Sequence, residues 1–160
     1  MLIPKPKYLI NGNVTQINIE QLKLDNIKAI IFDLDSTIME PHSAQLNQSV
    51  AQFLDLLKPD FKLAVLTNNK NLNYLERVKE VLDLPIIPHA RKPAQAGFLK
   101  IQSMFDLDPQ NILVVGDRPI TDIWGGHLVK MPTCLVNPLQ IEPKWLTLLR
   151  NLERALIKKN

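Results

Sequence analysis

The chain has 160 residues, of which 46% are hydrophobic and 22% charged, as expected for a globular protein with one hydrophobic core. Its net charge of +3 is too small to indicate a nucleic-acid-binding protein, and its single cysteine, Cys134, excludes an intramolecular disulfide. No apolar stretch is long enough to cross a bilayer, and the N-terminus lacks a signal-peptide pattern. We therefore expect a cytoplasmic protein, with contact to a membrane surface as the alternative.

The first elements of the chain carry little chemistry. Residues 1–27 are expected to form an irregular lead-in, apart from a short helix over residues 19–24 that Asn18 caps. Residues 29–32, Ala-Ile-Ile-Phe, form a short apolar run typical of a buried strand.

Two carboxylates, Asp33 and Asp35, end this first strand, and Ser36 and Thr37 after them favour a turn. Paired acids at the end of a buried strand suit a ligand site at the mouth of a sheet. They are equally consistent with the start of a loop or with a helix cap, so this segment alone does not decide between a site and a structural role.

Strand and helix patterns alternate along the rest of the chain. Further strands are expected over residues 62–67, 85–87, 111–115 and 133–136. The helices between them are expected to begin near Ser43, Asn71 and Pro93, and a helix around Ile123 to Leu128 is expected to be interrupted by Gly125 and Gly126. The alternation predicts an α/β fold: a Rossmann-like three-layer sandwich with a mainly parallel, five-stranded sheet.

An amphipathic helix is expected near the C-terminus, over residues 144–158. Its apolar residues are Trp145, Leu148, Leu149, Leu152 and Leu156. We expect this helix to pack on the sheet and its basic residues to be solvated. The alternative is that the helix contacts a membrane with the help of Arg150, Arg154 and Lys158, near which Lys159 is one more cation. The N-terminal segment with Leu2, Ile3, Lys5 and Lys7 is a second candidate for such a contact.

Polar residues follow three of the expected strands, at the points where these strands end. Right-handed crossovers place the carboxyl ends of parallel strands on one edge, so Asp33, Thr67 and Asp117 should converge there. Carboxylates at such an edge form a hard oxygen site that suits Mg²⁺. A nearby hydroxyl and the ammonium group of Lys92 can take phosphate oxygens.

These residues resemble the motifs of the haloacid-dehalogenase (HAD) superfamily. Residues 33–37, Asp-Leu-Asp-Ser-Thr, match its DxDxT motif, and Leu66-Thr67-Asn68 resembles the second motif. Lys92-Pro93 resembles the third, and Gly116-Asp117 through Asp122 resembles the fourth, GDxxxxD. All four stand in the order of the family.

The resemblance implies catalytic roles for three residues. Asp33 would be the nucleophile, forming an aspartyl-phosphate, and also a ligand of Mg²⁺. Asp35 would be the general acid and base and would give its backbone carbonyl to the metal. Lys92 would stabilise both Asp33 and the phosphate. An acid at position 35 is typical of phosphatases and phosphotransferases rather than of dehalogenases.

The resemblance also implies the binding residues. Thr67 would hold the phosphate, and Asn68 would contact phosphate or substrate through its backbone or side chain. Asp117 would be a further metal ligand, and Asp122 would support the metal or its waters.

The resemblance is narrower than the superfamily. Only about thirty residues separate Asp35 from Thr67, room for one helix and no cap domain. The cap-less type IIIA branch, which contains YqeG proteins and phosphatidylglycerophosphate phosphatases, has similar Arg91-Lys92-Pro93 and 116–126 segments. Ser36 and His127 depart from its pattern, in which Asn is usual, without removing a catalytic group.

The implied protein is a single phosphatase domain with a catalytic core over residues 28–137 and a C-terminal helix within 143–159. The implied reaction is Mg²⁺-dependent hydrolysis of phosphatidylglycerophosphate at a membrane surface, without a transmembrane segment and without nucleic acid. Two alternatives stay open. One is a phosphatase for a soluble metabolite or phosphoprotein, and the other is a non-catalytic binding module.

Overall fold

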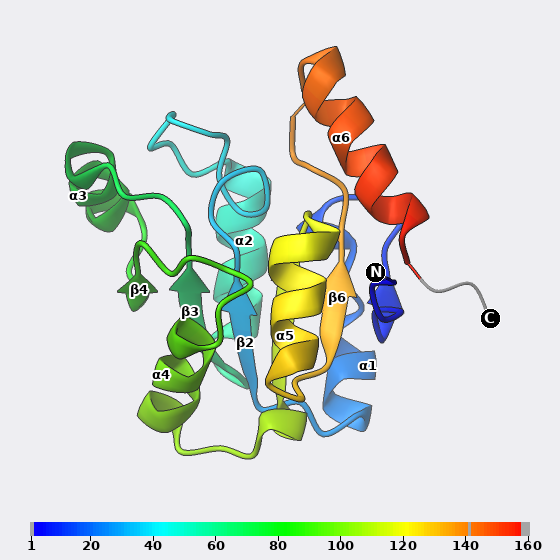
Figure 1. Cartoon of the computed structure of the whole chain (residues 1–160). Helices are drawn as coiled ribbons and strands as arrows, with labels where there is room; N and C mark the ends of the chain where they lie inside the picture. The colour runs from blue at the N-terminus through cyan, green and yellow to red at the C-terminus, as the bar shows by residue number, and fades with distance from the viewer. Residues whose placement is uncertain (1, 141, 158–160) are drawn as a thin grey trace.

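The computed structural model describes residues 2–140 and 142–157, and a six-stranded sheet runs through its centre (Figure 1). The strand order is β1-β6-β5-β2-β3-β4, and every pair of neighbours is parallel. The strands are β1 (Tyr8–Leu9), β2 (Ala29–Phe32), β3 (Lys62–Leu66), β4 (Ile86–Ile87), β5 (Ile112–Gly116) and β6 (Thr133–Leu135). The predicted α/β fold is confirmed.

The sheet has one strand more than the sequence predicts, because the lead-in is not irregular. Residues 8–9 form β1, in which Tyr8 pairs with Cys134 and Leu9 with Leu135 of β6. The short helix after it, α1 (Ile19–Leu24), begins at Asn18 as predicted, and Leu22 is buried. A two-residue edge strand has no periodicity of its own, so its pairing depends on the partner strand.

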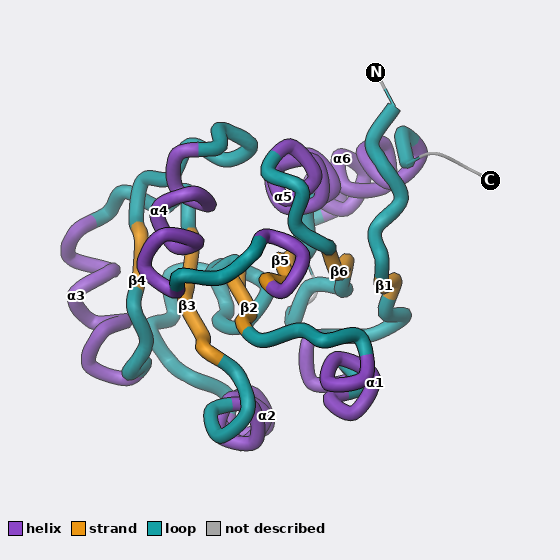
Figure 2. Tube along the Cα trace, turned by 90° about the horizontal axis from the view of Figure 1, so that it is seen from below, coloured by secondary structure: helices purple, strands orange, loops and turns teal. Residues whose placement is uncertain are grey.

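Helices cover both faces of the sheet (Figure 2). They are α2 (Gln48–Leu57), α3 (Leu72–Val81), α4 (Ala96–Phe105), α5 (Gly125–Leu128) and α6 (Lys144–Ala155), with 3₁₀ turns η1 (Val14–Gln16) and η2 (Pro109–Asn111) and a π-helical segment η3 (Pro119–Trp124). Side chains of β2 alternate between two cores. Ile30 and Phe32 pack with α2, whereas Ala29 and Ile31 pack with α4.

Two predicted helix starts are wrong. Asn47, not Ser43, caps α2 and accepts a hydrogen bond from the backbone N–H of Ser49 at 2.8 Å. The Ser43 hydroxyl instead donates to the Glu40 carbonyl within a preceding turn. Pro93 likewise lies in a turn, and α4 begins at Ala96.

The helix predicted to be interrupted at the two glycines is continuous through them. The π-helical segment η3 leads directly into α5 at Gly125. A Cβ atom on Gly126 would lie 2.6 Å from Cγ2 of Thr133 and 3.1 Å from Val114. The glycine therefore allows this helix to approach β5 and β6 closely, which draws η3 toward the edge where the strands end.

The expectation that the C-terminal helix buries its apolar face on the sheet is wrong. Helix α6 projects beyond the carboxyl edge of the sheet next to η3 (Figure 1). Its apolar residues are exposed, whereas Arg150 and Glu153 are buried. Arg154 is not fully solvated either, because it donates to the carbonyl of Val136. Lys158 and Lys159 lie outside the described residues.

Candidate active site

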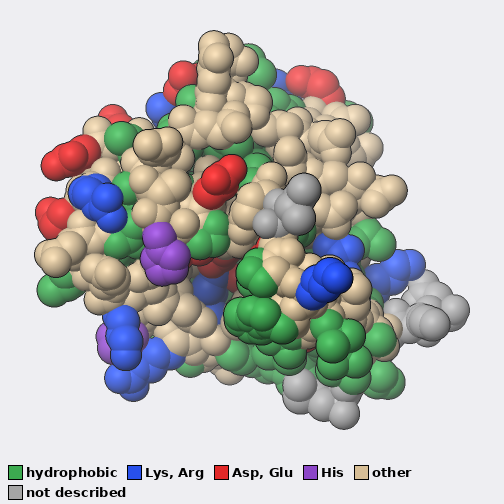
Figure 3. All heavy atoms as spheres, turned by 90° about the horizontal axis from the view of Figure 1, so that it is seen from above, with side chains coloured by type: hydrophobic (Ala, Val, Ile, Leu, Met, Phe, Trp, Pro, Cys, Tyr) green, Lys and Arg blue, Asp and Glu red, His purple; other side chains and the backbone are tan. Residues whose placement is uncertain are grey.

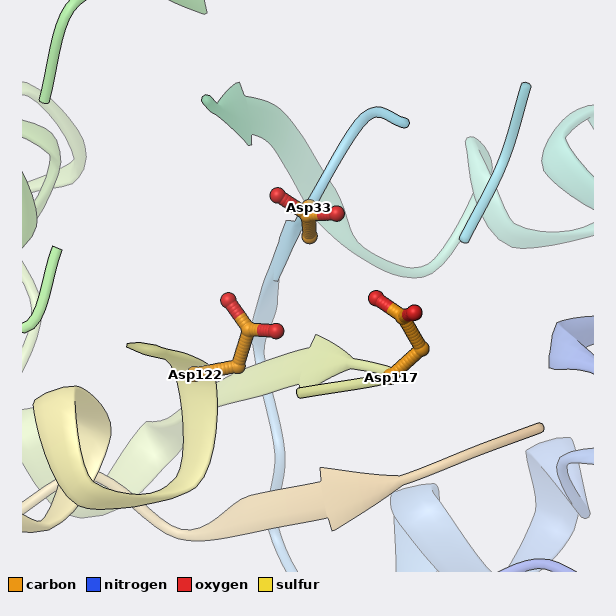
Figure 4. Close-up of side chains that lie close together, drawn as sticks. All are labelled: Asp33, Asp117 and Asp122. Carbon is orange, nitrogen blue, oxygen red and sulfur yellow. The ribbon is translucent and has the colours of Figure 1, made fainter. Parts of the chain in front are cut away.

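Three carboxylates from separate segments meet at the carboxyl edge of the sheet (Figure 4). In the sheet, Phe32 of β2 lies level with Val115 of β5, so the residues that follow these two strands emerge side by side. Asp33 follows β2, Asp117 follows β5, and Asp122 lies on η3. One carboxylate oxygen from each lies within 4.8 Å of the others.

Lys92 joins two of these carboxylates. Its Nζ lies 2.5 Å from Oδ1 of Asp33 and 2.6 Å from Oδ1 of Asp122, and its side chain is 3% exposed. Burial alone would lower the pKa of Lys92, but the adjacent charges of Asp122 and Asp33 outweigh it and raise the pKa above its usual value. The ammonium group therefore stays charged in the site.

Burial changes the acidity of the cluster. It raises the pKa of Asp33 to about 8 against the opposing charge of Lys92, and neighbouring carboxylates add to the rise. It raises the pKa of Asp117 to about 6 despite the opposing charge of Arg150. Carboxylates that lie this close together and are shielded from water repel one another, and binding a proton or a cation relieves that repulsion.

The donor set fits a magnesium ion. Asp117 and Asp122 are each 1% exposed, and the cluster offers carboxylate oxygens from three segments without a sulfur or imidazole ligand. Mg²⁺ prefers such hard oxygen ligands and keeps several waters. The residues present therefore satisfy the chemical requirement for this ion.

Asp122 reaches the cluster because residue 116 has no side chain. A Cβ atom on Gly116 would lie 2.2 Å from Cγ of Asp122. The other Asp122 oxygen, Oδ2, accepts a hydrogen bond from the backbone N–H of Arg118 at 3.1 Å. This contact fixes the carboxylate toward Lys92.

Asp35 lies apart from the three-carboxylate cluster. Its Oδ1 accepts a hydrogen bond from the Tyr74 hydroxyl at 2.8 Å, and its Oδ2 accepts one from Nδ2 of Asn69 at 3.0 Å. Burial, with a contribution from Asp35, raises the pKa of Tyr74 above its usual value, so the phenol keeps its proton. The Asp35 side chain is thus oriented by two donors, while its backbone follows directly on Asp33 and Leu34.

Asn68 orients the lysine loop with its side chain. Its Oδ1 accepts from the backbone N–H of Lys92 at 2.6 Å, and its Nδ2 donates to the carbonyl of Lys92 at 3.1 Å. Thr67 is 1% exposed, and its Oγ1 accepts from the N–H of Asn69 at 3.0 Å. The side-chain amide of Asn68 is therefore engaged with the protein, whereas the hydroxyl proton of Thr67 can point elsewhere.

Several groups at the site were not identified as site residues from the sequence. Thr37 donates from Oγ1 to Oδ1 of Asp117 at 3.1 Å, although the sequence places Thr37 only within a motif. Arg150 of α6 pairs with Oδ2 of Asp117 and donates to the Asp117 carbonyl at 2.7 Å. Its Nε donates to Glu142 at 3.0 Å. In the sequence, Arg150 lies 33 residues from Asp117 and is recognisable only as one of the cations on an amphipathic helix.

A cavity of about 260 Å³ opens at this edge, and its lining includes Asp33, Thr67, Lys92, Asp117, Leu146 and Arg150. A larger cavity, of about 730 Å³, lies elsewhere, between the N-terminal segment and the end of α5 with the residues that follow it. Two carboxylates of the cluster, together with Lys92 and Thr67, line the smaller cavity, so chemistry rather than volume identifies it as the candidate site.

Comparisons with known proteins find a matching family and similar phosphatases. The profile of the family described as "Mitochondrial PGP phosphatase" matches residues 3–137. "Probable phosphatase YqeG" of Bacillus subtilis is 29% identical over 146 residues, 91% of this chain and 85% of that protein.

A plant relative is similar over only part of its own length. "Phosphatidylglycerophosphate phosphatase 1, chloroplastic/mitochondrial" of Arabidopsis thaliana is 27% identical over 154 residues, which are 89% of this chain and 44% of that protein. Among solved structures, a HAD phosphatase from Thermococcus onnurineus superposes with a TM-score of 0.57 at 15% identity, over 74% of this chain and 90% of that one. That similarity supports the fold.

Proposed function

We propose that this chain, which belongs to the family described as mitochondrial PGP phosphatase, is an Mg²⁺-dependent phosphatase of phosphatidylglycerophosphate. Membership of the HAD superfamily and the phosphatase class follow from the family and the relatives. The metal and the lipid substrate are our proposal. The observation that carries it is the cluster of Asp33, Asp117 and Asp122 around Lys92.

The first step is attack by Asp33. Lys92 holds Oδ1 of Asp33 at 2.5 Å, whereas Oδ2 accepts only a long hydrogen bond of 3.4 Å from the Thr37 hydroxyl, so Oδ2 is the oxygen that bonds to phosphorus. As that bond forms, the bond between phosphorus and the ester oxygen breaks, and Asp35 gives its proton to the leaving oxygen. The product is an aspartyl-phosphate and an alcohol.

The second step releases phosphate. Asp35 takes a proton from a water molecule, whose oxygen bonds to phosphorus while the bond to Asp33 breaks. Tyr74 and Asn69 hold the Asp35 carboxylate in one orientation for both proton transfers. Thr67 and Lys92 donate to the phosphoryl oxygens and stabilise their charge.

Asp33, Asp117 and the backbone carbonyl of Asp35 would hold Mg²⁺, with Asp122 supporting the ion or its waters. When bound, the ion supplies positive charge that offsets the charge of the transferring group. The three close carboxylates and the raised pKa of Asp33 support this role, because a cation relieves their mutual repulsion.

The lipid substrate is supported by two observations. Phosphatidylglycerophosphate is the substrate named for the plant relative. The segment from Asp33 to Phe61 holds only one helix, α2, so no cap domain is inserted there to close the site over a small metabolite. An open site accommodates a headgroup at a surface.

The decisive experiment measures phosphate release from phosphatidylglycerophosphate in detergent micelles, with and without Mg²⁺. Asp33→Asn should lower kcat by at least about 10³-fold, because it removes the nucleophile while keeping its shape. Asp55→Asn is the matched control, since this exposed carboxylate on α2 pairs with Lys58 and does not line the cavity, and it should retain full activity. Turnover by Asp33→Asn, or by the parent protein in chelator, would contradict the mechanism.

The substrate is tested separately with a panel of esters. Release should be faster from the lipid than from sugar phosphates, nucleotides or a phosphopeptide. A faster soluble substrate would keep the phosphatase and replace its substrate. No release from any ester, with Mg²⁺ present, would favour a binding module.

A further inference from the structure

Helix α6 exposes a row of large apolar side chains to solvent. Trp145 is 68% exposed, Leu148 62% and Leu152 59%, and Leu149 and Leu156 are also exposed. We call these five residues the α6 apolar face. Figure 3, which looks onto the carboxyl ends of the strands, shows hydrophobic side chains gathered beside the central hollow. A contiguous apolar face of this kind is uncommon on a protein surface without a partner.

The opposite face of the helix fixes this orientation. Arg150 is 5% exposed and pairs with Asp117, while Glu153 is 3% exposed and accepts from Nε of Arg118 at 3.0 Å. Rotating the apolar residues inward would break both ion pairs and leave buried charges without partners. The exposure is therefore a consequence of how α6 is anchored.

The same helix forms part of the active-site wall. Leu146 and Arg150 line the cavity that also contains Asp33 and Lys92. Whatever covers the α6 apolar face is consequently brought to the opening of the site. A partner that carries the substrate would gain most from this position.

The N-terminal segment extends the exposed apolar surface. The backbone N–H of Ile3 donates to the carbonyl of Leu156 at 2.8 Å, so residues 2–3 lie against the end of α6. Ile3 is buried there, whereas Leu2 is 59% exposed. Two segments that are far apart in sequence thus form one surface.

The charge of this surface indicates the occupant. Lys144 is exposed at the start of α6. The described acidic residues of the helix and its N-terminal flank, Glu142 and Glu153, have side chains only 2% and 4% exposed, each paired with arginine. The surface therefore offers apolar groups and a cation without an exposed carboxylate, which complements an anionic lipid layer.

The geometry points to the α6 apolar face, extended by Leu2, as the surface that docks this enzyme on an anionic bilayer. The inference rests on the proposed function, because the bilayer is the layer that holds the substrate. A helix of 12 residues is about 18 Å long, too short to cross the hydrocarbon core, and it would lie in the interface plane. Among residues 2–140 and 142–157, no helix has the length and apolar composition of a membrane span.

The test compares two double variants in vesicle sedimentation. Leu148→Gln/Leu152→Gln replaces two leucines of α6 that are 62% and 59% exposed. The control, Leu56→Gln/Leu72→Gln, replaces leucines of α2 and α3 that are 65% and 70% exposed. The vesicles contain equal parts of phosphatidylglycerol and phosphatidylcholine. The α6 variant should bind at least about tenfold more weakly than the parent, and the control should bind like the parent. Equal binding by both variants would overturn the inference.

Activity separates this inference from the proposed function. Both variants should hydrolyse a soluble aryl phosphate at the parental rate, while the α6 variant alone should lose activity on lipid in vesicles. If no ester is hydrolysed, the proposed function fails, yet vesicle binding still tests the docking surface. Unchanged lipid activity in vesicles by the α6 variant would overturn the docking surface alone.

Self-association is tested with the same variants. Sedimentation velocity should show equal masses for the parent and the α6 variant. A parent dimer that becomes a monomer in the α6 variant, with vesicle binding unchanged, would assign the face to a second copy of the chain and overturn the inference.

Tryptophan emission provides a direct readout. The chain has two tryptophans, so Trp124→Phe leaves Trp145 as the reporter. Its emission should shift to shorter wavelength on the anionic vesicles and stay unchanged with vesicles of phosphatidylcholine alone. Emission that is unaffected by anionic vesicles would contradict insertion of Trp145.

Discussion

Helices α2 and α6 have similar lengths and both are amphipathic, but they expose opposite faces. Helix α2 buries Val50, Phe53, Leu54 and Leu57 against the sheet. Helix α6 buries Arg150 and Glu153 and exposes its leucines. One helix contributes mainly to the core and the other to the active site.

The difference shows that an amphipathic pattern predicts a stripe but does not say which neighbour meets it. Helix α2 faces Ile30 and Phe32 of β2, an apolar surface that favours apolar burial. Helix α6 faces the end of the sheet, where Asp117 and Arg118 present charged groups. Buried charges require charged partners, so the polar face of α6 turns inward there.

The largest expected effect is on the α2 side of the comparison. Phe53 is 5% exposed in the core, and Phe53→Ala should lower the free energy of unfolding by about 3–5 kcal/mol, because it removes buried apolar area and leaves a cavity. Urea denaturation followed by circular dichroism measures this change. A loss below about 1 kcal/mol would indicate that α2 is not part of the cooperative core.

The next effect is on the polar face of α6. Arg150→Met should lower the free energy of unfolding by about 3 kcal/mol, because Asp117 and Glu142 stay buried without their partner. It should also lower kcat/KM by at least about tenfold through misplacement of Asp117. Lys144→Met, on the same helix but exposed, is the control, and it should change neither the free energy of unfolding nor kcat/KM for a soluble aryl phosphate.

A third effect is the pH dependence of the carboxylate cluster beside α6, in which the α2 core takes no part. In the metal-free protein, the pKa of Asp33 is about 8 when folded against 3.8 ordinarily, so the unfolding free energy falls as pH rises between these values. Mg²⁺ takes the place of the proton, so its affinity should fall by up to about tenfold, or about 1.4 kcal/mol, for each pH unit below about 8.

Calorimetric titration with Mg²⁺ near pH 6 and near pH 8 measures this dependence. Asp33→Asn should flatten it, whereas Phe53→Ala on α2 should leave its slope unchanged. A pH-independent affinity in the parent protein would show that no proton is displaced from the carboxylates.

The smallest effect is on the apolar face of α6. Leu152→Ala should change the free energy of unfolding by less than about 0.5 kcal/mol, because this leucine is 59% exposed and fills no core position. The same urea experiment as for Phe53→Ala measures it. A loss comparable to that of Phe53→Ala would mean that α6 packs its leucines inward in solution.

Much of the fold was predictable because it depends on local patterns. Buried strands appear as apolar runs, and Asn18 and Asn71 cap α1 and α3 as predicted. The edge of the sheet that β1 forms was not predictable in this way. A strand of two residues, β1, has no pattern, and only Cys134 and Leu135 of β6 give it a position.

The positions of the candidate site residues were predictable to a similar degree. Parallel strands carry Asp33, Thr67 and Asp117 to one edge, and the structure brings Lys92 and Asp122 to the same place. The sequence did not reveal that Tyr74 and Asn69 hold Asp35, because neither belongs to a motif.

Apart from β1 and the starts of α2 and α4, the sequence by itself determined which segments become strands and helices, and in which order the acids, the hydroxyl and the lysine reach the sheet edge. These features depend on side-chain periods of two and 3.6 residues and on the handedness of crossovers. Only the tertiary structure decided that Arg150 pairs with Asp117 and that the leucines of α6 remain outside. The orientation of a helix depends on the charges of the surface that it meets, and here that surface is formed by residues more than thirty positions away in the chain.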